Sequence, residues 1–201
     1  MHARSDYPFH RLGLHAASFL MSDSNVFLTN TCENATLNQY WYSPATVAVL
    51  VAEVLQHGTR AAFVSTPSVF FSLPPCALKD CSRVFDIDPQ WKGNAAFTAY
   101  DFRAPLAVPK ELLHSFDFVL IDPPFITSEV LQAYASTTRL LLAPGGKVLL
   151  STVAENAPLL LELLSLTPLH FLPACPTLVY QFTLFSNYQS DALGLPNPEL
   201  Q

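Results

Sequence analysis

A carboxylate, two prolines and an aromatic ring directly follow an apolar segment in the middle of the chain. Residues 116–121 are mostly apolar and are followed by Asp122, Pro123, Pro124 and Phe125. Proline fixes φ at about −65° and lacks a backbone N–H, so nearby carbonyl oxygens are left free to accept hydrogen bonds from a substrate N–H. The four residues are predicted to form a catalytic group that holds an amino group for methyl transfer. A strand that merely stops at a proline turn is the alternative.

Acidic residues also end two other segments that are rich in β-forming residues. Asp86 and Asp88 follow residues 83–85, and an acid at the end of the second strand of an α/β sheet is placed to bind the ribose hydroxyls of a nucleotide. Asp86 is the first choice and Asp88 the second. Asp101 follows Tyr100 and is expected to accept from an adenine amino group, while Phe102 covers the ring. Turn or cap roles are the alternative for these acids.

The loop after the first predicted strand contains no glycine, although close approach of a backbone to a ligand usually calls for one. Its residues Ser65, Thr66, Pro67 and Ser68 are nevertheless expected to contact the cofactor. The backbone N–H groups at the start of the following helix can face a carboxylate there.

Three consecutive aromatic residues and an amide precede a capped helix. They are Gln39, Tyr40, Trp41 and Tyr42. Three neighbouring rings cannot all face one core, so one or two are expected at the site, where this group is predicted to bind substrate. An aromatic plug at the end of the sheet is the alternative.

The elements that position these residues alternate between helices and strands, which predicts a doubly wound, mostly parallel sheet of seven strands in an α/β fold. A helix is predicted from Ser43-Pro44 to Gly58, because serine caps a helix start and proline suits its first position. Further helices are expected at 129–142, with Ser128 as the cap, and at 159–166. The strands are expected at residues 60–66, 83–87, 96–100, 116–122, 147–152, 169–172 and 178–185.

Length and composition indicate one globular domain. The chain has 201 residues, of which half are hydrophobic. Residues 37–201 are expected to form this domain, and residues 1–36 a peripheral arm with weak periodicity. The acid-poor arm leaves a faint transit-peptide alternative, but the cytoplasm is favoured.

Charge and cysteine content restrict the partners. A net charge of −6, with scattered Lys and Arg, argues against nucleic acid as the main partner. The four cysteines lack metal-ligand spacing, so no metal site is predicted and reduced thiols are expected. No apolar run reaches the length of a bilayer span, so a membrane partner is not expected, and a monomer is predicted.

The ordered motifs between residues 37 and 188 resemble those of the eukaryotic elongation factor 1-alpha lysine methyltransferases, formerly described as adenine-N6 DNA methyltransferases. The resemblance rests on residues 39–43, 64–69, 85–88, 100–102, 122–125 and 187–188. It implies a Rossmann-like class I fold that uses S-adenosyl-L-methionine, and methyl transfer to a lysine of the translation factor. The chain departs from the family at Pro89-Gln90, where the family carries basic residues, and around Pro74-Pro75.

A substrate lysine is then expected to enter between Phe125 and the Tyr40 and Trp41 rings and to donate to Asp122 and the Pro123 carbonyl. Two other hypotheses stay open. The same site could admit an adenine amine of DNA or RNA, stacked on Phe125 after base flipping. A catalytically silent methyltransferase-like module that docks a partner is the second, because a fold alone does not establish activity.

Overall fold

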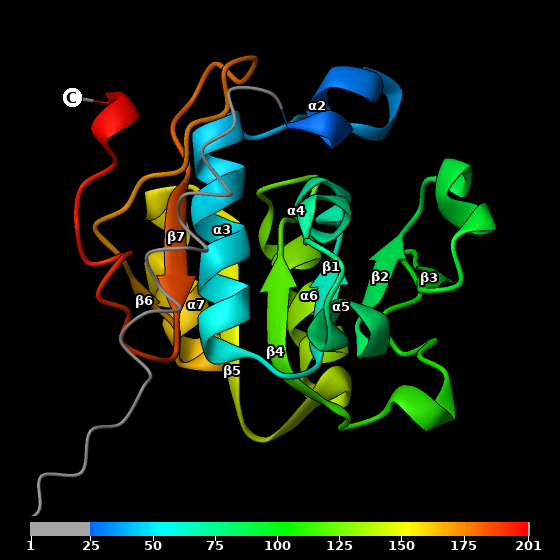
Figure 1. Cartoon of the computed structure of the whole chain (residues 1–201). Coiled ribbons are helices and arrows are strands. Elements are labelled where there is room, and N and C mark those ends of the chain that lie inside the picture. The colour runs from blue at the N-terminus through cyan, green and yellow to red at the C-terminus, as the bar shows by residue number, and fades with distance from the viewer. Residues whose placement is uncertain (1–24, 201) are drawn as a thin grey trace, which may run out of the picture.

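The computed structural model describes residues 25–200, which form a seven-stranded sheet in the order β3-β2-β1-β4-β5-β7-β6 (Figure 1). Strands β1 to β5 are parallel, and β7 runs antiparallel to both of its neighbours. The strands are β1 (Ala61–Val64), β2 (Arg83–Asp86), β3 (Phe97–Ala99), β4 (Phe116–Ile121), β5 (Leu142–Thr152), β6 (Thr167–Pro168) and β7 (Thr183–Ser186). The predicted mostly parallel α/β sheet is confirmed.

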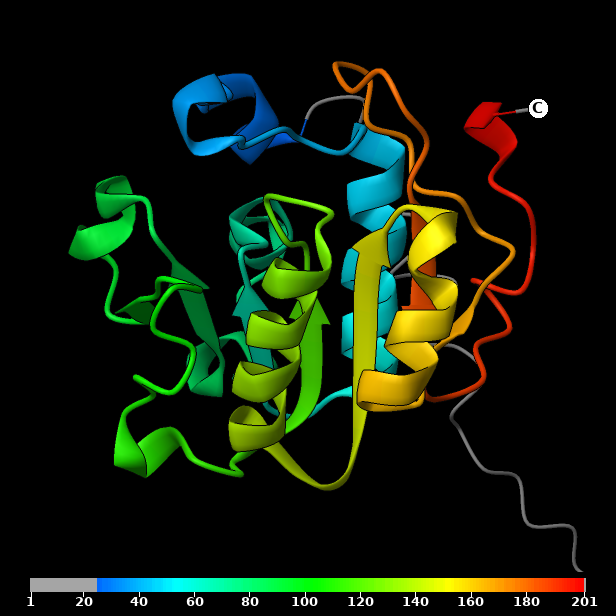
Figure 2. The same ribbon diagram turned by 180° about the vertical axis from the view of Figure 1, so that it is seen from behind.

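Helices cover both faces of the sheet. The α-helices are α2 (Val26–Asn30), α3 (Pro44–His57), α4 (Pro67–Ser72), α5 (Ala77–Cys81), α6 (Ser128–Leu141) and α7 (Ala157–Leu164). Short 3-10 helices are η2 (Ala35–Leu37), η3 (Pro89–Gly93), η4 (Lys110–Leu112), η5 (Ala154–Asn156) and η6 (Pro198–Leu200). Figure 1 shows α3, α4 and α5 on one face, and Figure 2 shows α6 and α7 on the other. Each face buries its own apolar core, as expected of a doubly wound sheet.

Helix α3 begins and ends as the sequence predicts. Gly58, which follows it, is required for close packing and not for a left-handed backbone conformation. Ser43 Oγ accepts from the Thr46 N–H at 3.1 Å, and Pro44 occupies the first turn. Gly58 has a φ of −111°, so it is not in the left-handed conformation usual for a glycine after a helix. A Cβ at this position would lie 3.0 Å from Cβ of Phe118. Glycine therefore lets the helix end approach β4 closely.

Several predicted bounds need correction. The sixth strand is β6 at residues 167–168 and not 169–172, and β7 covers only the end of the range 178–185. Strand β5 starts at Leu142, directly after α6, instead of after the glycine pair. The N-cap of α6 is Thr127, whose side chain makes no capping hydrogen bond, and Ser128 is the first helical residue.

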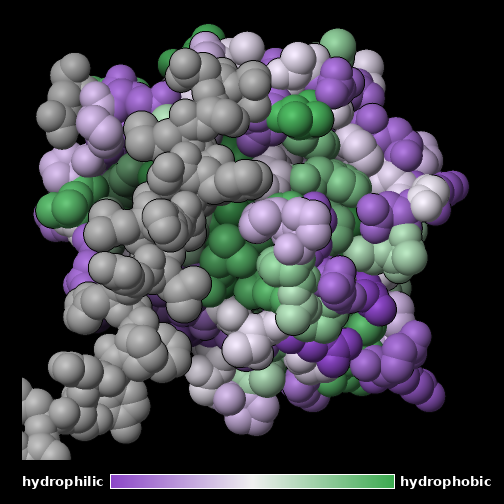
Figure 3. Space-filling view, in the orientation of Figure 1, coloured by the Kyte–Doolittle hydropathy of each residue, from purple (hydrophilic) through white to green (hydrophobic). Residues whose placement is uncertain are grey.

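The carboxyl ends of β1 and β4 point toward the end of the sheet over which α2 lies (Figure 1). Functional residues at these strand ends are therefore gathered on one side of the molecule. Figure 3 shows that hydrophobic residues also gather near the centre of one face. Within residues 25–200, no helix is long and apolar enough to cross a membrane.

Candidate active site

A cavity of about 310 Å³ lies beyond the carboxyl ends of β1, β2 and β4. It is lined by the predicted site residues except Thr66 and Asp88. The lining residues that the sequence analysis singled out are Gln39, Tyr40, Trp41, Tyr42, Ser65, Pro67, Ser68, Asp86, Asp101, Phe102, Asp122, Pro123, Pro124 and Phe125. Segments far apart in sequence thus meet at one site.

Asp122 stands at the end of β4, where its N–H donates to the Val64 carbonyl of β1 at 3.2 Å. Ser151, on β5, donates through Oγ to Asp122 Oδ1, and the buried Tyr42 hydroxyl donates to Ser151 Oγ at 2.7 Å. Burial raises the pKa of Asp122 to about 6, although the hydrogen bond from Ser151 opposes this rise. Asp122 is therefore mostly ionised at neutral pH and acts as a hydrogen-bond acceptor.

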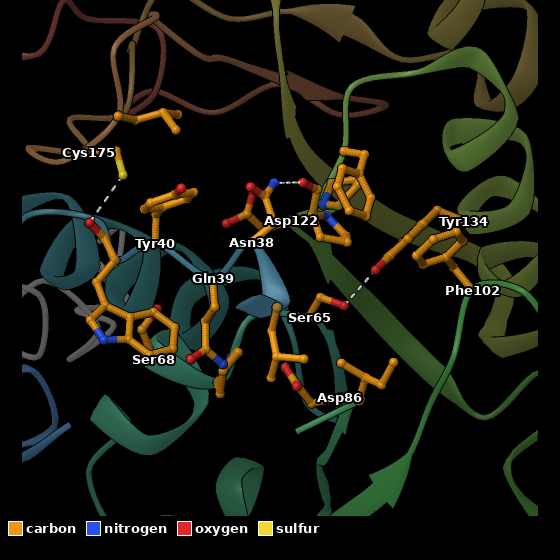
Figure 4. A pocket seen from close by; sticks show the side chains of 18 of the residues that line it. Asn38, Gln39, Tyr40, Ser65, Ser68, Asp86, Phe102, Asp122, Tyr134 and Cys175 are labelled. Atoms are coloured by element: carbon orange, nitrogen blue, oxygen red, sulfur yellow. Dashed lines mark hydrogen bonds between the residues drawn. The ribbon is translucent and has the colours of Figure 1, made fainter. Parts of the chain in front are cut away.

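A second polar contact crosses the cavity beside Asp122. Asn38 donates through Nδ2 to the backbone carbonyl of Pro124, as the dashed line in Figure 4 shows. Asn38 follows η2 with a φ of 53°, a left-handed conformation that asparagine tolerates better than most residues. The contact joins the segment before α3 to the turn after β4.

Asp86, the last residue of β2, lines the cavity, and Asp88 does not. Asp86 is 5% exposed, burial raises its pKa to about 6, and its Oδ1 accepts from the Asp88 N–H at 2.8 Å. Asp88 instead caps η3, because its carboxylate accepts from the backbone and side chain of Gln90 and, at 3.4 Å, from Gln39. Asp88, the second choice for the acid that binds the ribose, therefore caps η3 instead of facing the cavity.

The glycine-free loop after β1 reaches the conformation that glycine usually supplies. Ser65 has a φ of 57°, its N–H donates to the Phe85 carbonyl at 2.8 Å, and its hydroxyl lies 2.6 Å from that of Tyr134 (Figure 4). Hydrogen bonds on both sides therefore hold a strained backbone in place. Thr66, the N-cap of α4, is buried away from the cavity and makes no side-chain capping bond.

Asp101 and Phe102 both line the cavity, but the carboxylate already has a partner. Arg103 donates to Asp101 at 2.6 Å, and hydrogen bonding from Arg103 lowers the pKa of Asp101. The Phe102 ring meets Phe125 edge-on, with centroids 6.1 Å apart, and is stacked on Tyr134 at 6.3 Å. An aromatic wall closes this side of the cavity.

The three consecutive aromatic residues lie in different surroundings. Tyr42 belongs to the core next to α3. Trp41 is buried against Phe27, with ring centroids 5.3 Å apart, and its indole N–H donates to the Thr31 carbonyl. Tyr40 is half-buried and points toward the cavity in Figure 4. All three residues are nevertheless among those that line the cavity.

Several residues of the site were not identified from sequence. Asn38, Tyr134 and Cys175 are among the further residues that line the cavity, and the Cys175 thiol donates to the Trp41 carbonyl at 3.3 Å. Ser151 is not part of the lining but donates to Asp122. Ser151 carried a usable signal, since it follows the apolar residues 148–150 at a strand end. The other three carried none. In the part of the chain that the structure describes, no three His, Cys, Asp or Glu side chains are grouped to hold a metal.

Comparison with solved structures shows the fold. The Thermus thermophilus branched-chain polyamine synthase, in complex with N4-aminopropylspermidine and 5'-methylthioadenosine, matches with a TM-score of 0.60 and 16% identity over 87% of this chain, which spans 63% of the synthase. The Burkholderia thailandensis 1,6-didemethyltoxoflavin-N1-methyltransferase, with S-adenosylhomocysteine bound, matches with a TM-score of 0.50 and 14% identity over 95% of this chain and 94% of its own. The fold is that of the Rossmann-like class I methyltransferases.

Sequence comparison then gives the family. A family model described as probable N6-adenine methyltransferase matches residues 33–190. EEF1A lysine methyltransferase 1 of Bos taurus is 34% identical over 183 residues, covering 88% of this chain and 80% of that protein. The Danio rerio protein of the same name is 34% identical over 169 residues, covering 79% of this chain and all of its own. The chain belongs to the EEF1A lysine methyltransferase family.

The predicted enzyme class, protein-lysine N-methyltransferase, and the cofactor, S-adenosyl-L-methionine, are confirmed.

Proposed function

We propose that this chain transfers a methyl group from S-adenosyl-L-methionine to a lysine ε-amine of elongation factor 1-alpha. The observation that carries the proposal is a single cavity that joins an acceptor turn, Asp122 and Pro123, to a nucleotide-type acid, Asp86, and an aromatic wall. The names of the relatives support a translation factor as substrate.

The residues near β1, β2 and β3 fit the cofactor. Asp86 is assigned to the ribose hydroxyls, since its carboxylate lies at the end of β2 and lines the cavity. Phe102 covers the adenine, and Asp101, although paired with Arg103, offers an acceptor for its amino group. The backbone of residues 65–68 approaches the polar tail, with Ser65 in the left-handed conformation that close approach requires. Asp88 has no place in this assignment.

The residues after β4 fit the lysine. Its aliphatic stem passes between Phe125, which is 46% exposed, and Tyr40. Trp41 supports this wall from behind, since its ring packs against Phe27, and Tyr42 supports Asp122 through Ser151. The amine donates to the Asp122 carboxylate and to the Pro123 carbonyl, so its lone pair is directed at the donor methyl carbon.

Bound S-adenosyl-L-methionine supplies a methyl group on a positively charged sulfur. The neutral amine forms a bond to the methyl carbon while the carbon–sulfur bond breaks, and a methylated ammonium group results. A free lysine with a pKa of about 10.4 is mostly charged at neutral pH, so a proton must first leave, and water accepts it. Asp122 and Pro123 act mainly by alignment, which lowers the barrier without a strong base.

The proposal also covers location and assembly. A translation factor as substrate supports action in the cytoplasm, and the chain is proposed to act there as a monomer. Both properties stay predictions.

Methylation assays test the function. The purified protein, labelled cofactor and separate samples of elongation factor 1-alpha, DNA and RNA are incubated together. We expect label on the protein substrate, and Asp122→Ala is expected to lower kcat by roughly 100-fold or more while calorimetry still shows cofactor binding. Label on adenine instead would favour the nucleic-acid hypothesis. No heat of cofactor binding to the wild-type protein would favour a silent module.

A further inference from the structure

The turn after β4 presents four oxygen atoms that could accept a hydrogen bond from a substrate amine. Two belong to the Asp122 carboxylate, and the others are the backbone carbonyl oxygens of Pro123 and Pro124. The protein already fills two of the four. Ser151 donates to Asp122 Oδ1, and Asn38 donates to the Pro124 carbonyl (Figure 4).

Other hydrogen bonds hold the two donors, Ser151 and Asn38, in these orientations. The Tyr42 hydroxyl donates to Ser151 Oγ, which leaves the single Ser151 proton for Asp122. Asn38 ends a small closed loop in which its own N–H donates to the Ala35 carbonyl and the Gln39 N–H donates to the Asn34 carbonyl. The Tyr42 hydroxyl also lies close to Asp122, but its single proton is donated to Ser151. Among residues 25–200, no other donor is bonded to Asp122 Oδ2 or to the Pro123 carbonyl. Two acceptors therefore stay open.

We propose that Asn38 is a positioning residue that withholds the Pro124 carbonyl from the substrate, so that the site offers two acceptors and holds the neutral amine in preference to the ammonium ion. The inference rests on the proposed methyl transfer to an amine and deepens it. Nothing in the sequence analysis had assigned Asn38 a role.

Hydrogen-bond counting supports this inference. A neutral primary amine has two N–H groups and one lone pair, whereas an ammonium ion has three N–H groups and no lone pair. Two acceptors satisfy the amine and leave its lone pair free to attack. A third acceptor at the same turn would pair with the third N–H and so stabilise the form that cannot react.

The other titratable groups that line the cavity do not account for the protonation state of the bound amine. The charged side chains that line it besides Asp122 are Asp86, Asp101 and Arg103, and the last two are paired with each other. Burial raises the pKa of the Cys175 thiol to about 11, so this group stays neutral across the relevant range. The remaining titratable lining residues are tyrosines.

Two substitutions separate the role of the amide from that of the backbone. Asn38→Gly removes the donor but keeps the left-handed conformation, and Asn38→Asp keeps the shape but replaces the donor by an acceptor. Ser165→Gly is the matched control, since Ser165 has a φ of 56°, is exposed and ends α7 away from the cavity.

The readout is kcat at saturating cofactor and substrate from about pH 6.5 to about pH 9.5, because the pH dependence of kcat reports groups in the bound complex. For Asn38→Gly we expect a roughly tenfold lower kcat at neutral pH that recovers at alkaline pH, which corresponds to about one unit in the pKa of the bound amine. Asn38→Asp is expected to shift the profile further. Calorimetry should show cofactor binding unchanged in both variants, and Ser165→Gly should match the wild type.

Other outcomes overturn the inference. A kcat that falls by the same factor at every pH, or does not change, would mean that Asn38 has no influence on the protonation of the amine. If the wild-type protein methylates no lysine at all, the proposed function fails first, and the two failures are thereby distinguished. Thermal melts of both variants establish that each is folded before the profiles are compared.

Discussion

Two carboxyl groups with raised pKa values face the same cavity. Burial raises the pKa of both Asp86 and Asp122 to about 6, from the ordinary value of 3.8. Both must nevertheless be ionised in the proposed function, one to accept from ribose hydroxyls and the other to accept from an amine. The site therefore keeps two carboxylates charged in surroundings that oppose the charge.

This arrangement predicts a stability gain from Asp122→Asn. Since the folded pKa lies above the unfolded one, the stability associated with this group is fully present below about pH 4 and is lost as pH rises through 6. The amide cannot ionise, so the variant is expected to have a free energy of unfolding higher by about 3 kcal/mol at pH 8 and nearly unchanged at pH 4. Urea denaturation at the two pH values measures this.

Asp117→Asn is the opposite control. Burial acts to raise the pKa of Asp117, but hydrogen bonds from Thr59 and Arg60 outweigh burial and lower it. Loss of that carboxylate should lower stability at pH 8. If Asp122→Asn also lowers stability at pH 8, Asp122 is not destabilising as an anion.

Sequence could predict which strand ends line the cavity but not which of their polar atoms already have hydrogen-bond partners. Asp86 and Asp122 were predictable, since parallel strands bring their carboxyl ends together. The choice between Asp86 and Asp88 was decided by Gln90, which donates to Asp88 in a local turn. Asn38 donates to a residue 86 positions away, and no local pattern indicates such a partner.

A buried carboxylate, that of Glu53, holds the C-terminal part of helix α3 in place. Glu53 is 2% exposed and accepts from the Tyr188 hydroxyl at 2.9 Å and from Ser190 Oγ at 3.0 Å, while His57 Nε2 lies 3.3 Å away. These contacts attach the segment after β7 to the helix. A buried charge requires such partners, so the network supports the position of α3 against the sheet.

Tyr188→Phe is expected to lower the free energy of unfolding by about 1 to 2 kcal/mol, because Glu53 Oε1 loses the hydrogen bond from the Tyr188 hydroxyl while the ring packing stays. Chemical denaturation measures the change. Tyr180→Phe serves as control, since Tyr180 is 44% exposed, and should have little effect. Equal stabilities of wild type and Tyr188→Phe would mean that water replaces the lost donor.

At the level of elements, long periodic helices and apolar strands were predictable, and short ones were not. Helices α4 and α5 have six and five residues, too few for periodicity to be seen. Residues 169–172 were predicted as a strand, and three of the four are apolar. Two backbone hydrogen bonds are made there, from the Leu169 N–H to the Leu184 carbonyl and from the Phe171 N–H to the Leu193 carbonyl. The residues that pair with β7 as a strand are 167–168.

For the molecule as a whole, the segment before the predicted domain boundary supports the wall of the candidate active site. Phe27, on α2, is 9% exposed and packs against Trp41, Phe71 and Trp91. Glu33 accepts from the Trp41 N–H at 2.8 Å. A boundary at residue 36 would cut these contacts, and residues 1–24 of the expected arm lie outside the described residues. The division of the chain stays a prediction.

Phe27→Ala is expected to lower the free energy of unfolding by about 3 kcal/mol, because it leaves a cavity among three rings. It should also raise the KM for the protein substrate, since Trp41 and the adjacent Tyr40 lose their support. Denaturation and initial-rate measurements on the variant check both effects. Val26→Ala is the neighbouring control, since Val26 is 74% exposed. A loss of stability with unchanged KM would show that α2 does not position the substrate wall.

The two border strands of the sheet are unusually short. Strand β3 has three residues, and β6 has two, of which one is Pro168, a residue without a backbone N–H. A border strand with few unpaired donors is a poor template for a strand from another molecule. The sheet is thereby protected against edge-to-edge aggregation, which matters for a chain that is half hydrophobic.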